Sequence, residues 1–209
     1  MIRLAFLTVA CGSTLSACAI PQEPVPAARA AASWRNVATE DDRERLRNWR
    51  TVWLKAIERA RAAGHAGELA QEGVLLDPDA GLTEPLPPPG DYDCRTIKVG
   101  SQGASGLDYV AYPAFRCRIG SDDGVVTFTK LSGSQRPIGV ILPDTDRRSI
   151  FLGTLQLGDE TGALQYGRDR ERDMAALVER IGERRWRLAF PSPHFESLLD
   201  VLELTPRSP

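Results

Sequence analysis

The chain from about residue 90 onwards most constrains the fold, because it holds a series of short strand-like runs. Turn signals such as Ser121-Asp122-Asp123-Gly124 separate the runs, and residues 185–190 alternate between apolar and other side chains, as a half-buried strand does. The expected strands cover residues 91–99, 112–120, 124–131, 138–143, 149–157, 174–181, 184–190 and 195–204. About eight strands in series predict an antiparallel meander that curls into a small up-and-down barrel or a strongly bent sheet.

The part before these strands is expected to be helical, over residues 34–76. Thr39 with Asp42 makes a variant capping box, and a helix is predicted over residues 39–63. It carries one apolar stripe at helical spacing, made by Leu46, Trp49, Trp53, Ile57 and Ala60. A shorter helix is expected over 67–72, and a proline-rich connection over 77–90 leads into the strands. The stripe favours docking onto the domain over a partner-binding or membrane-surface helix. The predicted class is therefore α+β, mainly antiparallel β.

The N-terminus has the pattern of an export signal. A basic start precedes an uncharged apolar stretch that is shorter than the roughly 20 residues a membrane-spanning helix needs. Leu15-Ser16-Ala17-Cys18 resembles the lipobox of bacterial lipoproteins. The resemblance implies a signal peptide over residues 1–17 and lipidation of Cys18, and an ordinary signal cut after Ala17 is the alternative. Residues 18–33 are then an anchor and a Pro/Ala-rich tether, and 34–206 a single domain.

This leader sets the expected location. The resemblance implies a protein held on a membrane of the cell envelope and facing the periplasm. Ala19 is not the aspartate that usually retains lipoproteins at the inner membrane, so the outer membrane is favoured. Of the four cysteines, Cys94 and Cys117 remain for an oxidising compartment and predict a disulfide. A redox-active pair is disfavoured because the chain has no Cys-x-x-Cys motif.

Charge and motifs exclude several function classes. A net charge of -2 argues against nucleic-acid binding, and two histidines against a multi-histidine metal centre. Common hydrolase, phosphate-binding and dinucleotide motifs are absent from the sequence, so no catalytic residue, metal or cofactor is predicted. His65 and His194 are interpreted as structural. The same holds for acidic pairs that suit turns, namely Asp77/Asp79, Asp144/Asp146 and Asp159/Glu160.

The arginines suggest one candidate site. The chain has three lysines, Lys55, Lys98 and Lys130, so the other 23 of its 26 basic residues are arginine. If Cys94 faces Cys117 across an antiparallel pair, Arg95 faces Arg116 and Asp93 faces Arg118. Like charges that face each other are unfavourable without an acid or anion between them. We therefore consider an anion or carboxylate site on Arg95, Arg116 and Arg118, with internal salt bridges or solvent-facing arginines as the favoured alternative.

Four blocks of the sequence resemble an uncharacterised bacterial family. They are PPPGDYDCRTIKVG (87–100), YPAFRCRIG (112–120), SIFLGTLQLGDE (149–160) and RWRLAFPSPHFESLLDVLEL (185–204). They are similar to members of the domain of unknown function 4893. The resemblance covers about residues 34–206 and implies a single envelope domain, without an activity, cofactor or site residue.

Three function classes follow from these observations. The absence of catalytic motifs favours a non-enzymatic binding or accessory protein with a small-molecule or protein ligand. A hydrolase that uses Asp144, Asp146 or Asp200 is the first alternative. A purely structural envelope component is the second.

Overall fold

The computed structural model describes residues 33–103 and 106–207 of the chain. Its helices come first: α1 (Trp34–Val37), α2 (Glu40–Arg47), α3 (Trp49–Ala62), α4 (Ala66–Glu72) and a 3-10 helix (Gly73–Leu75). The strands are β1 (Gly90–Ser101), β2 (Tyr109–Ala111), β3 (Phe115–Asp122), β4 (Val125–Lys130), β5 (Gln135–Pro143), β6 (Ser149–Leu157), β7 (Asp173–Gly182), β8 (Arg185–Pro191) and β9 (Ser197–Pro206). The predicted signal peptide, Cys18 and nearly all of the tether lie outside the described residues.

The strands form a closed antiparallel barrel, as the sequence predicts. Each of the strands β3 to β8 pairs with the strand that follows it, and β1 pairs with both β3 and β9, so the sheet closes on itself. β2 is an additional strand on β1. Gly139 of β5 faces Gly153 of β6. A Cβ on Gly139 would lie 2.2 Å from the carbonyl oxygen of Leu152, so this position requires glycine.

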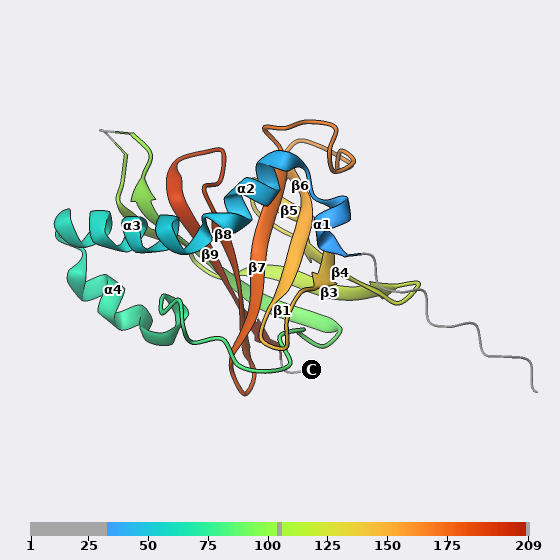
Figure 1. The fold of residues 1–209 in the computed structure, drawn as a ribbon, viewed down its shortest axis with the longest axis horizontal. Helices are drawn as coiled ribbons and strands as arrows, with labels where there is room; N and C mark the ends of the chain where they lie inside the picture. Colours follow the sequence, from blue (N-terminus) through green and yellow to red (C-terminus); the bar gives the residue numbers. More distant parts are fainter. Residues whose placement is uncertain (1–32, 104–105, 208–209) are drawn as a thin grey trace, which may run out of the picture. The chain divides into compact units, whose positions relative to one another are not determined.

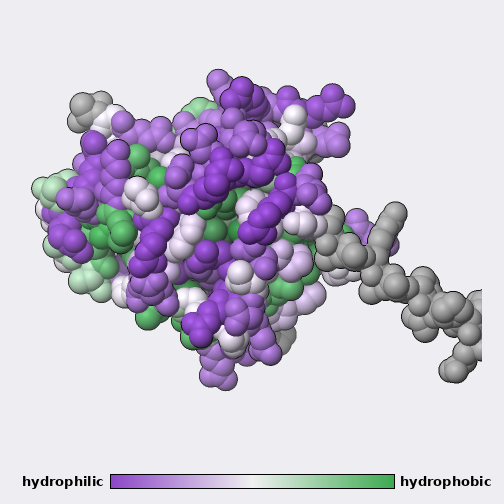
Figure 2. Space-filling view, in the orientation of Figure 1, coloured by the Kyte–Doolittle hydropathy of each residue, from purple (hydrophilic) through white to green (hydrophobic). Residues whose placement is uncertain are grey.

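Alternate residues of each strand feed two separate cores. The interior of the barrel is filled by large apolar side chains such as Tyr92, Phe128, Phe151 and Leu188 together with the Cys94–Cys117 disulfide. The second core lies on the outer face of the barrel, where α2 and α3 lie across β7, β8 and β9 (Figure 1). The apolar stripe of the helices therefore docks onto the domain, which is the favoured sequence interpretation. Hydrophilic side chains cover most of this face of the molecule (Figure 2).

A buried ion pair fixes the helices to the barrel. Arg187 of β8 is fully buried, and its guanidinium bonds the Glu179 carboxylate at 2.6 and 2.9 Å. The same guanidinium donates to the carbonyls of Val74, Leu75 and Asp77, at the end of the 3-10 helix. One cation thus joins the carbonyl groups at the end of the 3-10 helix to the barrel strand β8.

Two details of the predicted fold are wrong. The helix expected over 39–63 is two helices, because Asn48, with φ -93° and ψ 4°, ends α2 and begins α3. The expected strand 112–120 begins only at Phe115, as β3, because the chain breaks around Pro113, which has no N–H to donate to the ladder. Residues 109–111, expected to belong to a loop, form β2. The shorter helix, expected over 67–72, spans Ala66–Glu72.

Candidate functional site

The barrel has a polar end, which we call the mouth. It is the end where β4, β6 and β8 finish and β5, β7 and β9 begin. Lys98 follows Cys94 on the interior side of β1, Lys130 follows Phe128 on β4, and Asp200 precedes Leu202 on β9. All three charged residues are nearly buried, with exposed fractions of 6%, 6% and 8%. Such residues are almost never buried without partners, so the mouth differs from the apolar remainder of the interior.

Lys98 and Asp200 form an ion pair inside the barrel. Lys98 Nζ lies 3.0 Å from Asp200 Oδ2, and the other carboxylate oxygen accepts a short hydrogen bond from Ser197 Oγ. Glu196, on the rim, lies 3.1 Å from the same Nζ. Burial alone would lower the pKa of Lys98, but the two carboxylates raise it above its ordinary value. Lys98 is therefore a charged amine with its counter-charge in place.

Lys130 is in a different situation. Its Nζ donates to the carbonyl oxygen of Gln135 at 2.9 Å and lies 4.1 Å from the centre of the Phe115 ring. None of the ion pairs among the described residues includes it. Burial, with Lys98 and Arg136 nearby, lowers the pKa of Lys130 to about 8. A lysine of this kind marks a candidate functional site, since its charge is not compensated by the protein.

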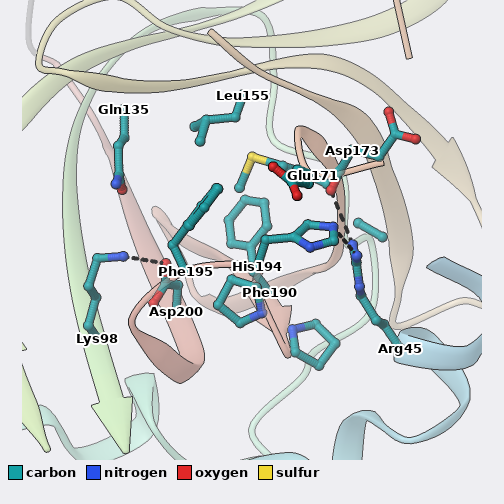
Figure 3. A pocket seen from close by; sticks show the side chains of 14 residues that line it. Arg45, Lys98, Gln135, Leu155, Glu171, Asp173, Phe190, His194, Phe195 and Asp200 are labelled. Carbon is teal, nitrogen blue, oxygen red and sulfur yellow. Dashed lines mark hydrogen bonds and ion pairs between the residues drawn. The ribbon is translucent and has the colours of Figure 1, made fainter. Parts of the chain in front are cut away.

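Two small cavities lie beside these groups. The outer one has a volume of about 30 Å³, with Lys98 and Asp200 on one side and Arg45, Asp173 and His194 on the other (Figure 3). Apolar side chains lie between the two polar sides, namely Leu155, Phe190 and Phe195 (Figure 3). The deeper one, also about 30 Å³, has a polar lining made by Lys130, Asp200, Thr96 and Gln135. The rest of its lining is apolar, namely Pro137, Leu155, Met174, Phe190 and Leu202. Each is large enough for a water or a group of two or three heavy atoms.

The loop between β8 and β9, residues 192–196, covers the mouth. Polar contacts hold it, since Gln102 Nε2 donates to the carbonyl of Pro193 at 2.5 Å and His194 contacts the Arg45 guanidinium. Burial and then the Arg45 charge lower the pKa of His194. Ser192 and Glu196 have φ of 48° and 72°, a conformation unfavourable for residues other than glycine. Backbone strain of this kind clusters at binding and active sites.

Comparison with known proteins gives the family but not a function. The chain matches the family described as "Domain of unknown function (DUF4893)" over residues 34–204. It belongs to this family. No curated protein and no solved structure matches the chain. Within the described residues of this DUF4893 domain, no cluster of three or more His, Cys, Asp or Glu side chains has the arrangement to hold a metal ion. None of the described helices has the length and apolar character needed to cross a membrane.

The predicted disulfide of the DUF4893 domain is confirmed, but the predicted register is wrong. Cys94 and Cys117 are joined with their Cα atoms 5.9 Å apart. Cys94 faces Phe115, whereas Cys117 faces Tyr92, so the bridge runs diagonally between strands that are shifted by two residues from the expected pairing. A shift of two residues leaves the same side chains inside the barrel, so the apolar pattern allows both registers.

The observed register removes the reason for an anion site on the three candidate arginines, because no two of them face each other across β1 and β3. Arg116 faces Asp93 rather than Arg95. Arg95 lies between two carboxylates, bonding Glu72 at 2.5 Å and Glu203 at 3.0 Å. Arg118 bonds Asp91 at 2.7 Å on the surface. An anion site on Arg95, Arg116 and Arg118 stays a prediction, but two facing arginines no longer support it.

The acidic pairs and His65 take structural positions, whereas His194 lines the outer cavity of the mouth. Asp77 accepts from the backbone N–H of Asp79 at 2.9 Å in a turn, as predicted. Asp144 accepts from Trp34 Nε1 at 2.8 Å and from Arg35 at 3.0 Å. The remaining interactions join secondary structure: the Asp146 carbonyl accepts from Glu84 N, Glu160 bonds Arg172, and His65 bonds Glu68 and stacks on Tyr109. Asp200 alone among the hydrolase candidates lies at the mouth.

Sequence reasoning missed the lysines. Two of the three lysines point into the barrel, although the remaining 23 basic residues of the chain are all arginine. Lysine provides a compact ammonium whose pKa shifts readily when buried, whereas the arginine side chain stays charged. Lys98 and Lys130 lie an even number of residues after Cys94 and Phe128, so each faces the same side of its strand. This spacing, together with lysine in place of arginine, is the sequence pattern that could have predicted the site.

Proposed function

We propose that this DUF4893 protein is a lipid-anchored, non-enzymatic binding protein of the cell envelope, facing the periplasm, with the barrel mouth as its binding site. One observation carries the proposal: buried lysines and an aspartate stand beside two cavities in an otherwise apolar barrel. An interior that serves stability alone gains nothing from charges, because burying a charge is costly unless it is paired. A binding site explains why they are there.

The lipid anchor is supported by the leader and by Leu15-Ser16-Ala17-Cys18. The Cys94–Cys117 disulfide is consistent with an oxidising compartment. Mass spectrometry of the membrane fraction tests this part. We expect an N-terminal peptide that begins at Cys18 and carries acyl chains, and its loss in a Cys18→Ser variant. An unmodified Cys18 in the exported wild-type protein would contradict it. Ala19 favours the outer membrane, which fractionation of the two membranes tests.

The binding role is tested by native mass spectrometry. Residues 31–209 form a compact unit that contains both cores and the disulfide, and we would export it to the periplasm and purify it without reductant. A small molecule retained in the native spectrum and absent after denaturation supports a binding protein. If no compound is retained and none binds in a ligand screen, the protein is better explained as a purely structural envelope component.

A second candidate is a periplasmic hydrolase. The chain of contacts from Ser197 through Asp200 to Lys98 favours it, because a carboxylate that accepts a serine proton is one way to activate a nucleophile. The two cavities are small, about 30 Å³ each, which favours binding of a small group over turnover of a larger substrate. Hydrolysis of p-nitrophenyl acetate decides between them: turnover that disappears in Ser197→Ala supports the hydrolase, and turnover unchanged by this substitution excludes Ser197.

A further inference from the structure

We infer that the ligand of the barrel mouth is a small organic monoanion, whose carboxylate group occupies the deeper cavity against Lys130 and whose uncharged part extends towards the opening. The inference rests on the proposed binding function and gives the chemical class of its ligand. Lys130, Lys98 and Phe190 carry the argument, and none of them was a candidate from the sequence.

The positive and negative charges inside the mouth do not balance. Lys98 is neutralised by Asp200 at 3.0 Å inside the barrel. Its second acid, Glu196, is 57% exposed at the rim and is therefore largely screened by solvent. Lys130 has no carboxylate within ion-pair distance among the described residues. Its charged neighbours are the cations Lys98 and Arg136 and the carboxylate of Asp200, which is already paired with Lys98. The interior of the mouth thus lacks one negative charge.

The ammonium group of Lys130 has hydrogen-bond donors that the protein does not use. An ammonium group has three donors. One donor of Lys130 goes to the Gln135 carbonyl, and the Phe115 ring covers another side of Nζ. The deeper cavity is lined by Lys130 together with Thr96, Gln135 and Asp200, whose two carboxylate oxygens already accept from Lys98 and Ser197. A carboxylate placed there would accept the remaining lysine donors in a charge-assisted bond, which is stronger than a neutral one.

The lining of the two cavities limits what the rest of the ligand can be. Between the deeper cavity and the opening stand apolar side chains, Leu155, Met174 and Phe190, shared by both cavities. The outer cavity is lined by the acids Glu171 and Asp173 (Figure 3). Its cations already have carboxylate partners, since Arg45 bonds Asp42 at 2.7 Å and Lys98 bonds Asp200 at 3.0 Å. These acids would repel a second negative charge on the ligand. An aliphatic or aromatic monocarboxylate satisfies both ends, whereas a polyanion does not.

The test compares two nearly isosteric probes, hexanoate and hexanamide, by protein-observed NMR titration of residues 31–209. We expect hexanoate to bind at least about tenfold more tightly, the value of one charge-assisted hydrogen bond. Lys130→Met should abolish this preference. Lys55→Met is the matched control, because Lys55 is the exposed lysine on α3 and its loss leaves the mouth unchanged.

The outcomes separate the inference from the proposed function. Equal binding of the two probes at the mouth overturns the monoanion inference and leaves the binding function standing. A hexanoate preference that survives in Lys130→Met places the anion elsewhere and also overturns it. If neither probe shifts the resonances of the mouth, the inference fails, and native mass spectrometry then decides the binding function separately.

Discussion

Lys130→Met is expected to make the ligand-free protein more stable, because the site requires a buried charge that the fold does not need. Burial lowers the pKa of Lys130 from 10.5 to about 8. The folded state therefore disfavours the charged amine by about 3 kcal/mol at pH 7. Lys130→Met also loses two favourable contacts of the amine, the hydrogen bond to the Gln135 carbonyl and the contact with the Phe115 ring. Their loss offsets about 1–2 kcal/mol of the stabilisation. A net gain of about 1–2 kcal/mol remains.

The pH dependence gives this prediction its sign. The unfolded chain binds a proton at Lys130 more strongly than the folded protein between pH 8 and pH 10.5, so wild-type stability gains from a rise in pH across this window. The advantage of Lys130→Met should shrink by about 1 kcal/mol between pH 7 and pH 9.

Urea unfolding at the two pH values measures both effects. Lys55→Met, on the exposed face of α3, should change the free energy of unfolding by less than about 0.5 kcal/mol. If Lys130→Met instead destabilises the protein by about 1 kcal/mol or more at pH 7, Lys130 is a structural group. The charge count behind the binding site would then be wrong.

Three further predictions concern the fold and the site. Replacing Cys94 and Cys117 by serine opens a ring with a sequence separation of 23, and urea unfolding should show a loss of about 3 kcal/mol. Arg187→Met leaves Glu179 buried without its partner, so the same assay should show a loss of about 3–5 kcal/mol, and a loss below about 1 kcal/mol would contradict the role of this pair. Hexanoate should bind less tightly above about pH 8 as Lys130 loses its proton, whereas Lys130→Arg, which stays charged, should show a flat profile in the NMR titration.

The barrel was predictable because its strands alternate clearly. The strand expected over 149–157 is observed as β6 with the same bounds, Ser149–Leu157. The other predicted strands differ mainly at their ends, except that the strand expected over 112–120 begins only at Phe115 and that β2 was not predicted. The register of β1 and β3 was not predictable. A shift of two residues keeps the same side chains inside the barrel, so the apolar pattern of the two strands is identical in both registers.

The site could be predicted only in part. The disulfide followed from cysteine count and compartment, but the arginine hypothesis depended on the register and lost its support with it. An interior position was not predicted for Lys98 and Lys130, because a lysine in a strand normally faces solvent. Their placement beside Asp200 depends on closure of the barrel between β1 and β9. That long-range pairing is not encoded in any local pattern, so sequence reasoning had no means to join them.

The ionisation of Lys130 tests the account most directly. The chain has three lysines, so an NMR titration of the lysine side chains gives few signals, and Lys130→Arg assigns the one of interest. We predict a pKa of about 8 for Lys130 in the free protein and a clear increase on addition of hexanoate, because a bound carboxylate stabilises the ammonium. A pKa near 10.5 in the free protein, unchanged by hexanoate, would contradict the account.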